Sequence, residues 1–333
     1  MIGVLEPTIE IQRGVPEGNR AMESISRRGF LRSTAGLAGA WTMAGADLQA
    51  QGTADSLRSD AIDAHAHVWS GDTQRYPLKP GMMKSQMLVA NFMPEELLDK
   101  SRRSGVRRIV LIQISYYGSD NACMLDAMRA NPGVFSGVAR VDGDPRPRET
   151  MLRLARLGVR GIRIVSGRQS PDRWLGQPEM AAIWQCAAER GMVLCALTGP
   201  EYFGALDAMC QKFPQTTLAL DHLGRIGFER PIRDEEVAQL CRLARHKRVC
   251  VKLSGFYALG RQQPPYLDLV PVIRRLFETF GPQRLMWGSD SPFQMIPPHR
   301  YRDSIELVRN RLDFLGAEDR QWLLRKTAER LFF

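Results

Sequence analysis

The sequence lacks three patterns that would each have pointed to a function. It has no run of five like charges, which argues against a nucleic-acid-binding tail although the formal net charge is +10. It has no Walker loop and no G-x-G-x-x-G motif after the first predicted strand, which argues against an open nucleotide-binding sheet. Its cysteine spacings match no zinc pattern such as C-x-x-C.

The overall composition contains nothing extreme. Hydrophobic residues make up 44% of the chain and charged residues 25%, as is usual for a globular protein. These values exclude wholesale disorder, a collagen-like sequence and a membrane protein with several spans. The length of 333 residues allows one large domain or two ordinary ones.

The apolar stretch near the start of the sequence is too short to span a bilayer. It runs from Ser33 to Ala46 and follows the arginine pair Arg27-Arg28, whereas a membrane span needs about 20 residues. An arginine pair before such a stretch is typical of a twin-arginine export signal, and small residues allow cleavage after Ala46 or Ala50.

We therefore expect residues 1–50 to be a twin-arginine signal with its lead-in, and residues 51–333 to be the mature domain. The signal would be handled by the twin-arginine translocase, and the mature protein would lie in the periplasm with no stable membrane anchor. The alternatives are a disordered basic tail or an uncleaved anchor, and Met22 is a second candidate start.

The six cysteines are few and scattered. Twin-arginine substrates fold in the reducing cytosol before export, so their cysteines are not expected to depend on disulfides. We expect all six to be small buried hydrophobic residues: Cys123, Cys186, Cys195, Cys210, Cys241 and Cys250.

From residue 60 onward, short β-rich runs alternate eight times with longer amphipathic ones. The predicted strands are 61–69, 107–115, 135–141, 159–165, 192–197, 216–222, 249–254 and 284–289. The predicted helices are 94–104, 121–130, 149–157, 179–190, 202–213, 234–246, 266–280, 301–314 and 318–331. Eight such repeats over this length predict an α/β fold, the (β/α)8 TIM barrel.

Two histidines two positions apart end the first predicted strand. Side chains alternate across a strand, so His65 and His67 point to one face, with Asp63 one layer deeper on it. Active sites of such barrels form at the C-terminal ends of the strands. If the shared face is the inner one, the two imidazoles meet at the mouth of the barrel instead of packing separately.

Polar residues also end two later strands. His222 has the parity of Leu218 and Leu220 and is expected to continue their face. Asp290 directly follows the eighth strand, where a carboxylate is costly unless it is paired or used. Capping of a helix is the alternative role for Asp290.

The strand-end motifs resemble those of the amidohydrolase superfamily. They are His65-Ala66-His67, Asp221-His222-Leu223-Gly224, Lys252-Leu253-Ser254-Gly255 and Gly288-Ser289-Asp290-Ser291-Pro292. The likeness is to the amidohydrolase-related branch, and within it to the 2-pyrone-4,6-dicarboxylate lactonase and galactarolactone isomerase-like proteins. The likeness to the branch runs from about Ile62 to the C-terminus, and residues 113–121, Gly161-Ile162-Arg163 and Arg225 carry the narrower resemblance.

One position departs from the metal-dependent members of this branch. They carry a histidine before Thr-Gly at the end of the fifth strand, where this sequence has Leu197. Leucine cannot ligate a metal, and the lactonase-like relatives work without one, so the resemblance implies no metal cofactor. If a metal binds, we expect zinc on His65, His67 and Asp290, with a water as the fourth ligand.

The resemblance implies hydrolysis of a carboxylated lactone. Asp290 would act as general base for water, and His65, His67 and His222 would donate hydrogen bonds to the carbonyl. Three arginines that could clamp substrate carboxylates and one serine donor complete the candidate site: Arg163, Arg225, Arg168 and Ser115.

Other functions stay open at this point. A metal-dependent decarboxylase or amide hydrolase would differ by its metal content, and a lactone isomerase would release no proton. A non-catalytic periplasmic binding protein is the alternative from another class, although it would need no general base. We expect a small anionic substrate and no nucleic acid as partners; the sequence makes no prediction of the oligomeric state.

Overall fold

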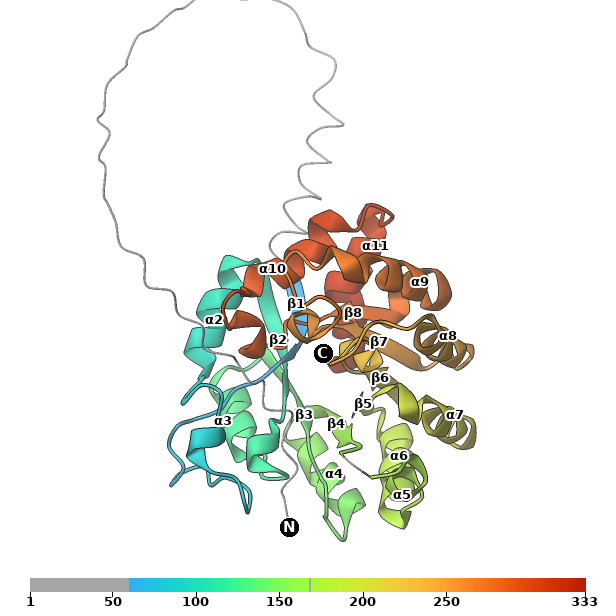
Figure 1. Cartoon of the computed structure of the whole chain (residues 1–333). Helices are drawn as coiled ribbons and strands as arrows, with labels where there is room; N and C mark the ends of the chain where they lie inside the picture. Colours follow the sequence, from blue (N-terminus) through green and yellow to red (C-terminus); the bar gives the residue numbers. More distant parts are fainter. Residues whose placement is uncertain (1–59, 168) are drawn as a thin grey trace, which may run out of the picture.

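The computed structural model describes residues 60–167 and 169–333. Its centre is one sheet of eight parallel strands in the order β1 to β8. Figure 1 shows the ring that these strands form. The strands are β1 Ala61–Ala66, β2 Val106–Ile112, β3 Phe135–Ala139, β4 Val159–Val165, β5 Val193–Leu197, β6 Thr217–Leu220, β7 Val249–Leu253 and β8 Leu285–Trp287. The predicted (β/α)8 barrel is confirmed.

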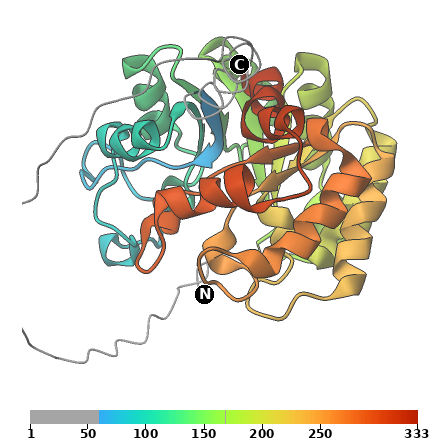
Figure 2. The same ribbon diagram turned by 90° about the horizontal axis from the view of Figure 1, so that it is seen from above.

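Helices surround this ring, as Figures 1 and 2 show. They are α2 Pro94–Arg103, α3 Ala122–Ala130, α4 Pro147–Arg156, α5 Pro171–Leu175, α6 Pro178–Arg190, α7 Phe203–Lys212, α8 Asp234–Arg242, α9 Val270–Phe280, α10 Tyr301–Glu306, α11 Ala317–Gln321 and α12 Thr327–Phe332. Proline stands in the first turn of α2, α4, α5, α6 and α9, where its missing N–H costs nothing. α5 is an element that the sequence did not predict.

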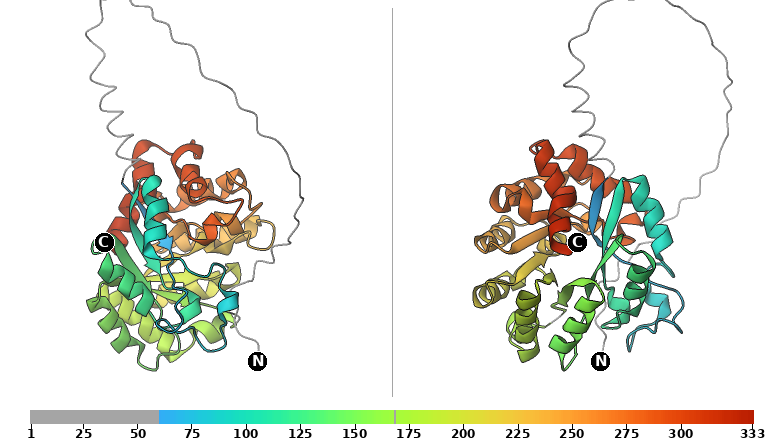
Figure 3. Two further views of the ribbon diagram at one scale, coloured as in Figure 1. Left: turned by 90° about the vertical axis from the view of Figure 1, so that its left-hand side faces the viewer. Right: turned by 180° about the vertical axis from the view of Figure 1, so that it is seen from behind.

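Apolar side chains of the strands alternate between two clusters. One packs against the surrounding helices and contains residues such as Ile109, Leu194 and Leu253. The other fills the barrel and includes Val110, Val138, Val193, Ala219 and Met286. Ala328 and Phe332 of α12 belong to this inner cluster, and Figure 3 shows from behind that the C-terminal helix lies over the centre of the ring.

The barrel closes where β8 meets β1. The N–H of Asp290 donates to the carbonyl of His65 at 2.7 Å, and the N–H of His67 donates to the carbonyl of Ser291 at 2.8 Å. Gly288 is needed at this seam because a Cβ there would lie 2.7 Å from the Cβ of His65. The closure therefore places the ends of the first and last strands side by side.

The cysteines are free, and five are buried while Cys241 is half-buried. The predicted export signal, and with it the boundary at residue 50, lies outside the described residues. Of the helices that the structure describes, none combines the length and the apolar character that a bilayer crossing requires.

Candidate active site at the carboxyl ends of the strands

Four of the predicted residues meet at the C-terminal end of the barrel. His67 Nε2 lies 3.1 Å from Asp290 Oδ1, and His65 Nε2 lies 3.6 Å from the same oxygen. His222 Nε2 lies 3.6 Å from Asp290 Oδ2. All four residues are buried, and we call this group the His–Asp cluster.

An irregularity near the end of β1 brings His65 to the cluster, where it meets His67 from just beyond the strand. The pairing with β2 shifts between Asp63 and Ala66, while Ile62 and Ala64 belong to the inner cluster. The prediction that Asp63 shares the face of His65 was therefore wrong. Its carboxylate instead accepts hydrogen bonds from the N–H of Ser289 and the hydroxyl of Tyr301, each at 2.8 Å, and so holds the β1–β8 seam.

His222 reaches the cluster by a different route from the one predicted. Leu218 and Leu220, whose parity it shares, pack outward against the helices, and the inner face of β6 continues through Ala219 to Asp221. His222 enters because its φ is +53°, in the left-handed region that ordinary residues rarely adopt. Strand alternation ends at Leu220, so parity could not place this residue.

Asp290 is held by two side chains. Besides the contact with His67, its Oδ2 accepts a hydrogen bond of 2.8 Å from the hydroxyl of Tyr257. Its backbone also has a positive φ, +61°, a strain of the kind found at functional sites. Within the described residues, the carboxylate contacts side chains of the site rather than the start of a helix, which favours the functional role over capping.

The charge states follow from burial and neighbouring charges. Burial lowers the pKa of His65 well below its usual value and also lowers that of His222, so both rings are neutral at pH 7. Burial alone would raise the pKa of Asp290, but the adjacent His222, His67 and His65 outweigh it and hold that pKa far below its usual range. Asp290 is therefore an ionised carboxylate, and the neighbouring rings of His65 and His222 are neutral.

A buried ion pair that was not predicted lies next to the cluster. Lys252 Nζ is 3.1 Å from Asp221 Oδ1 and 3.4 Å from His65 Nδ1, and the Lys252 and Asp221 side chains are both fully buried. Burial works against both charges, yet Asp221 raises the pKa of Lys252, and Lys252 and His65 hold the pKa of Asp221 well below its usual value. A lysine inside the apolar strand Val249–Leu253 was the sequence signal for this pair.

The predicted arginines and the predicted serine lie in different environments. Arg163 is buried, with its Nε 3.6 Å from Asp221 Oδ2. Arg225 is half-buried and its guanidinium lies 3.8 Å from the ring centre of Phe228. Arg168 lies outside the described residues. Ser115 is buried in the turn after β2 and, within the described part of the chain, makes no hydrogen bond to the cluster. Tyr257, which contacts Asp290, was missed because it lies in a loop with no strand parity.

The donor set fits a single metal ion. His67 Nδ1 lies 2.8 Å from the carbonyl of Ile112 and therefore carries a hydrogen, so Nε2 is the ring nitrogen that faces Asp290. The buried Nε2 of His65 has no hydrogen-bond partner among the described residues. One ligand atom each from His65, His67 and Asp290 lie within 4.8 Å of one another, which is the ligand set of a three-residue zinc site.

Comparisons with known proteins show which enzymes the chain resembles. The chain is 27% identical over 243 residues to an L-fucono-1,5-lactonase of Burkholderia ambifaria, covering 72% of this chain and 82% of the relative. It is 29% identical over 262 residues to a 2-pyrone-4,6-dicarboxylate hydrolase of Comamonas testosteroni, covering 75% and 82%.

Solved structures share the fold. A probable 2-pyrone-4,6-dicarboxylic acid hydrolase of Acinetobacter baumannii with bound citric acid has a TM-score of 0.71 at 23% identity, covering 82% of this chain and 98% of the other. An amidohydrolase of Burkholderia multivorans with bound zinc has a TM-score of 0.70 at 22% identity, covering 82% and 99%. The family model described as amidohydrolase matches residues 62–333, from the first strand through the last helix, and the chain belongs to the amidohydrolase family.

Proposed function

We propose that the protein hydrolyses a lactone that carries a carboxylate. The observation that carries the proposal is the convergence of three histidines on the ionised Asp290 at the barrel mouth, with the buried Arg163 in the same charged network. Relatives of this chain are named as lactonases and as a pyrone dicarboxylate hydrolase, which supports the same reaction class.

Asp290 acts as the general base. A water loses a proton to the Asp290 carboxylate while its oxygen bonds to the lactone carbonyl carbon. The ring C–O bond then breaks, and the leaving oxygen takes the proton back from Asp290. When substrate binds, the histidines donate hydrogen bonds to it instead of to Asp290. The carboxylate is then less stabilised, so Asp290 becomes a stronger base. General-base help of this kind contributes roughly 10²–10⁴ in rate.

The histidines stabilise the oxyanion that forms on the carbonyl. The neutral rings of His65 and His222 each still offer one N–H, which can be directed at the developing charge. The ring centres of His65 and His222 are 4.5 Å apart, and those of His65 and His67 are 5.1 Å apart. Removing one donor of an oxyanion site costs about 10²–10³ in turnover.

Arginine selects the substrate charge. Arg163 projects from β4 into the same buried network, and a guanidinium can hold a carboxylate by two parallel hydrogen bonds. Arg225, which follows His222 in the chain, is the second candidate. Arg163→Ala is expected to weaken use of a carboxylated lactone by roughly 10–150-fold, because hydrogen bonds to charged groups contribute about 1.5–3 kcal/mol.

The side chains at the strand ends favour a reaction without metal. Leu197, the last residue of β5, offers no ligand atom. If Zn²⁺ binds, His65, His67 and Asp290 would hold it, and it would supply Lewis acidity to the carbonyl or to a water.

The test is a panel of carboxylated and neutral lactones assayed with a pH indicator, with and without prolonged chelation. Ring opening releases a proton, so we expect acidification by carboxylated lactones that persists after chelation. Loss of activity on chelation and its return with Zn²⁺ would assign the site to the metal-dependent class. Conversion without proton release would identify an isomerase, and equal use of neutral lactones would refute the role of the arginines.

A further inference from the structure

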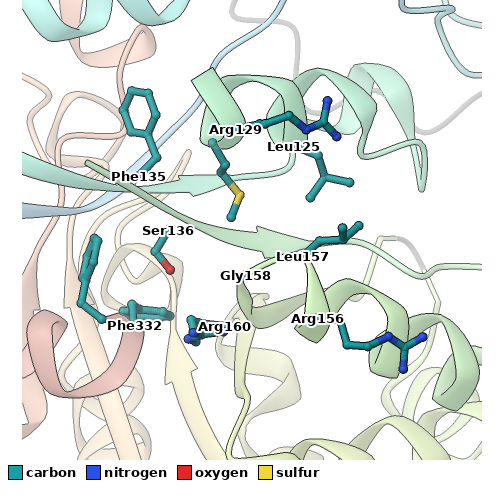
Figure 4. Close-up of a pocket in the computed structure, with 11 residues that line it drawn as sticks. Leu125, Arg129, Phe135, Ser136, Arg156, Leu157, Gly158, Arg160 and Phe332 are labelled. Atoms are coloured by element: carbon teal, nitrogen blue, oxygen red, sulfur yellow. The ribbon is translucent and has the colours of Figure 1, made fainter. Parts of the chain in front are cut away.

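A cavity lies at the opposite end of the barrel from the His–Asp cluster. Its volume is about 440 Å³. It is lined by residues of α3, by the start of β3, by the segment from the end of α4 to the start of β4, and by the end of α12. Figure 4 shows this arrangement. We call it the lower cavity.

The walls of the lower cavity combine apolar surface with cationic groups. Leu125, Met128 and Phe332 provide apolar walls. Arg156 and Arg160 are exposed, and no ion pair joins either of them to an acid within residues 60–167 and 169–333. Arg129, by contrast, is already paired with Asp126 at 2.8 Å. The cavity therefore offers two guanidinium groups for an anion.

Ser136 supplies a buried polar group in the same cavity. It is only 3% exposed, and its hydroxyl has no hydrogen-bond partner in the described part of the chain. Ser136 shares the inward parity of Val138, so its side chain lies at the lower end of the barrel and lines the cavity. A buried hydroxyl without a partner is destabilising by about 1–3 kcal/mol, which a ligand that accepts its hydrogen bond would remove.

We propose that the lower cavity binds a small amphipathic monocarboxylate, with an aromatic or short aliphatic body. The carboxylate accepts hydrogen bonds from Ser136 and Arg160, while the body packs on Leu125, Met128 and Phe332. A bare inorganic anion would leave the apolar walls in contact with water. A neutral apolar molecule would leave the hydroxyl of Ser136 unpaired.

The size of the cavity agrees with this ligand class. Small-molecule sites usually have volumes of about 300–1,000 Å³, with mostly apolar walls and a few polar groups that fix the ligand's orientation. The lower cavity falls at the small end of that range. The proposal is independent of the reaction proposed above, since no residue of the His–Asp cluster contributes to the cavity.

Calorimetric titration with benzoate and with octanoate tests the proposal, with benzyl alcohol and octanol as uncharged counterparts. Both carboxylates are expected to bind the unmodified protein, and the alcohols to bind much more weakly. Ser136→Ala and Arg160→Gln are each expected to weaken carboxylate binding by roughly 10-fold or more. Arg102→Gln, an exposed change on α2 away from the cavity, serves as the matched control and should leave affinity unchanged.

Carboxylates can also reach the candidate active site, so the experiment must distinguish binding there from binding in the lower cavity. Binding that survives both Ser136→Ala and Arg160→Gln belongs elsewhere and would overturn the proposal, as would absence of binding at millimolar concentration. Arg160 is exposed, so its variant is expected to fold even if Ser136→Ala does not. Lactone turnover of both variants should stay near that of the unmodified protein, because neither residue contacts the His–Asp cluster.

Discussion

Asp290 has two candidate roles that one substitution separates. Asn keeps the shape of the side chain but is not a useful base, so Asp290→Asn is expected to lower turnover by roughly 10²–10⁴. The melting temperature should stay level or fall modestly, because the low pKa of Asp290 means that its neighbours stabilise the charged form in the folded state, while the Asn oxygen can still accept from Tyr257. Steady-state rates and thermal melts of one preparation give both values. Turnover close to that of the unmodified protein would remove Asp290 from the mechanism.

Tyr257 positions Asp290 through its hydroxyl, which lies 2.8 Å from Asp290 Oδ2. Tyr257→Phe is expected to lower turnover roughly 10-fold, since hydrogen bonds to charged groups contribute about 1.5–3 kcal/mol. Loss of the donor also raises the pKa of the carboxylate, so the acidic limb of the pH–rate profile should move to higher pH. A matched control is Tyr76→Phe, because Tyr76 donates to Asp126 at 2.8 Å away from the site. Equal effects of the two changes on turnover would contradict the positioning role.

The sequence predicted which residues form the candidate site better than it predicted how their side chains are oriented. The spacing of His65 and His67 and the place of Asp290 after a strand were enough to bring them together. Parity failed at His222 because the backbone turns to positive φ after β6. Tyr257 could not be predicted, since the short turn Phe256–Ala258 has no periodicity that would show where its side chains point.

The seam between β1 and β8 is the element on which the site depends. In Gly288→Ala the new Cβ would lie 2.7 Å from the Cβ and 2.9 Å from the backbone nitrogen of His65. We expect a loss of about 1–3 kcal/mol in stability together with reduced turnover, because His65 must move. Gly204→Ala in α7 is the control, since no atom lies within 4 Å of the added Cβ. Unchanged melting temperature and turnover in Gly288→Ala would show that the seam accommodates the added methyl group, and would contradict the prediction.

Asp63 makes the same seam sensitive to pH. Burial raises its pKa to about 6, against about 3.9 in an unfolded chain. Between these values the folded state holds a proton that the unfolded state has lost, so the stability contributed by the protonated form is lost as pH rises through about 6. The free energy of unfolding of Asp63→Asn, relative to that of the unmodified protein, should therefore increase by about 3 kcal/mol between pH 4 and pH 7. Urea unfolding at the two pH values measures this difference, and a constant difference would contradict the assignment.

Most elements follow from sequence periodicity, and the exceptions have physical reasons. The predicted strand 159–165 coincides with β4, and the other strands differ mainly at their ends. α5 has five residues, too few to show an amphipathic repeat. The predicted helices 301–314 and 318–331 are interrupted by the wider turns Leu307–Arg311 and Trp322–Lys326. These turns preserve the apolar pattern while changing the hydrogen bonding, so periodicity cannot reveal them.

For the whole molecule, we propose export through the twin-arginine translocase to the periplasm. Replacing Arg27 and Arg28 by Lys is expected to leave an uncleaved precursor in the cytosol, because the arginine pair is what the translocase reads. Fractionation with immunoblotting would show this, as the mature form should lack the residues up to about Ala50. Replacing Arg13 and Arg20 in the lead-in by Lys is the control. A full-length cytosolic product of the unmodified gene would refute the proposal.

The partners of the seam lie far apart along the chain, and this sets when activity can arise during synthesis. His67 and Asp290 are 223 positions apart, so a ribosome must add all the intervening strands before the two can touch. At about 5–20 residues per second, the nascent protein spends at least ten seconds with histidines that have no carboxylate to face. With Asp290 in the proposed role of base, no fragment released before residue 290 would be active, and a translocase that accepts only folded cargo would receive this protein after translation.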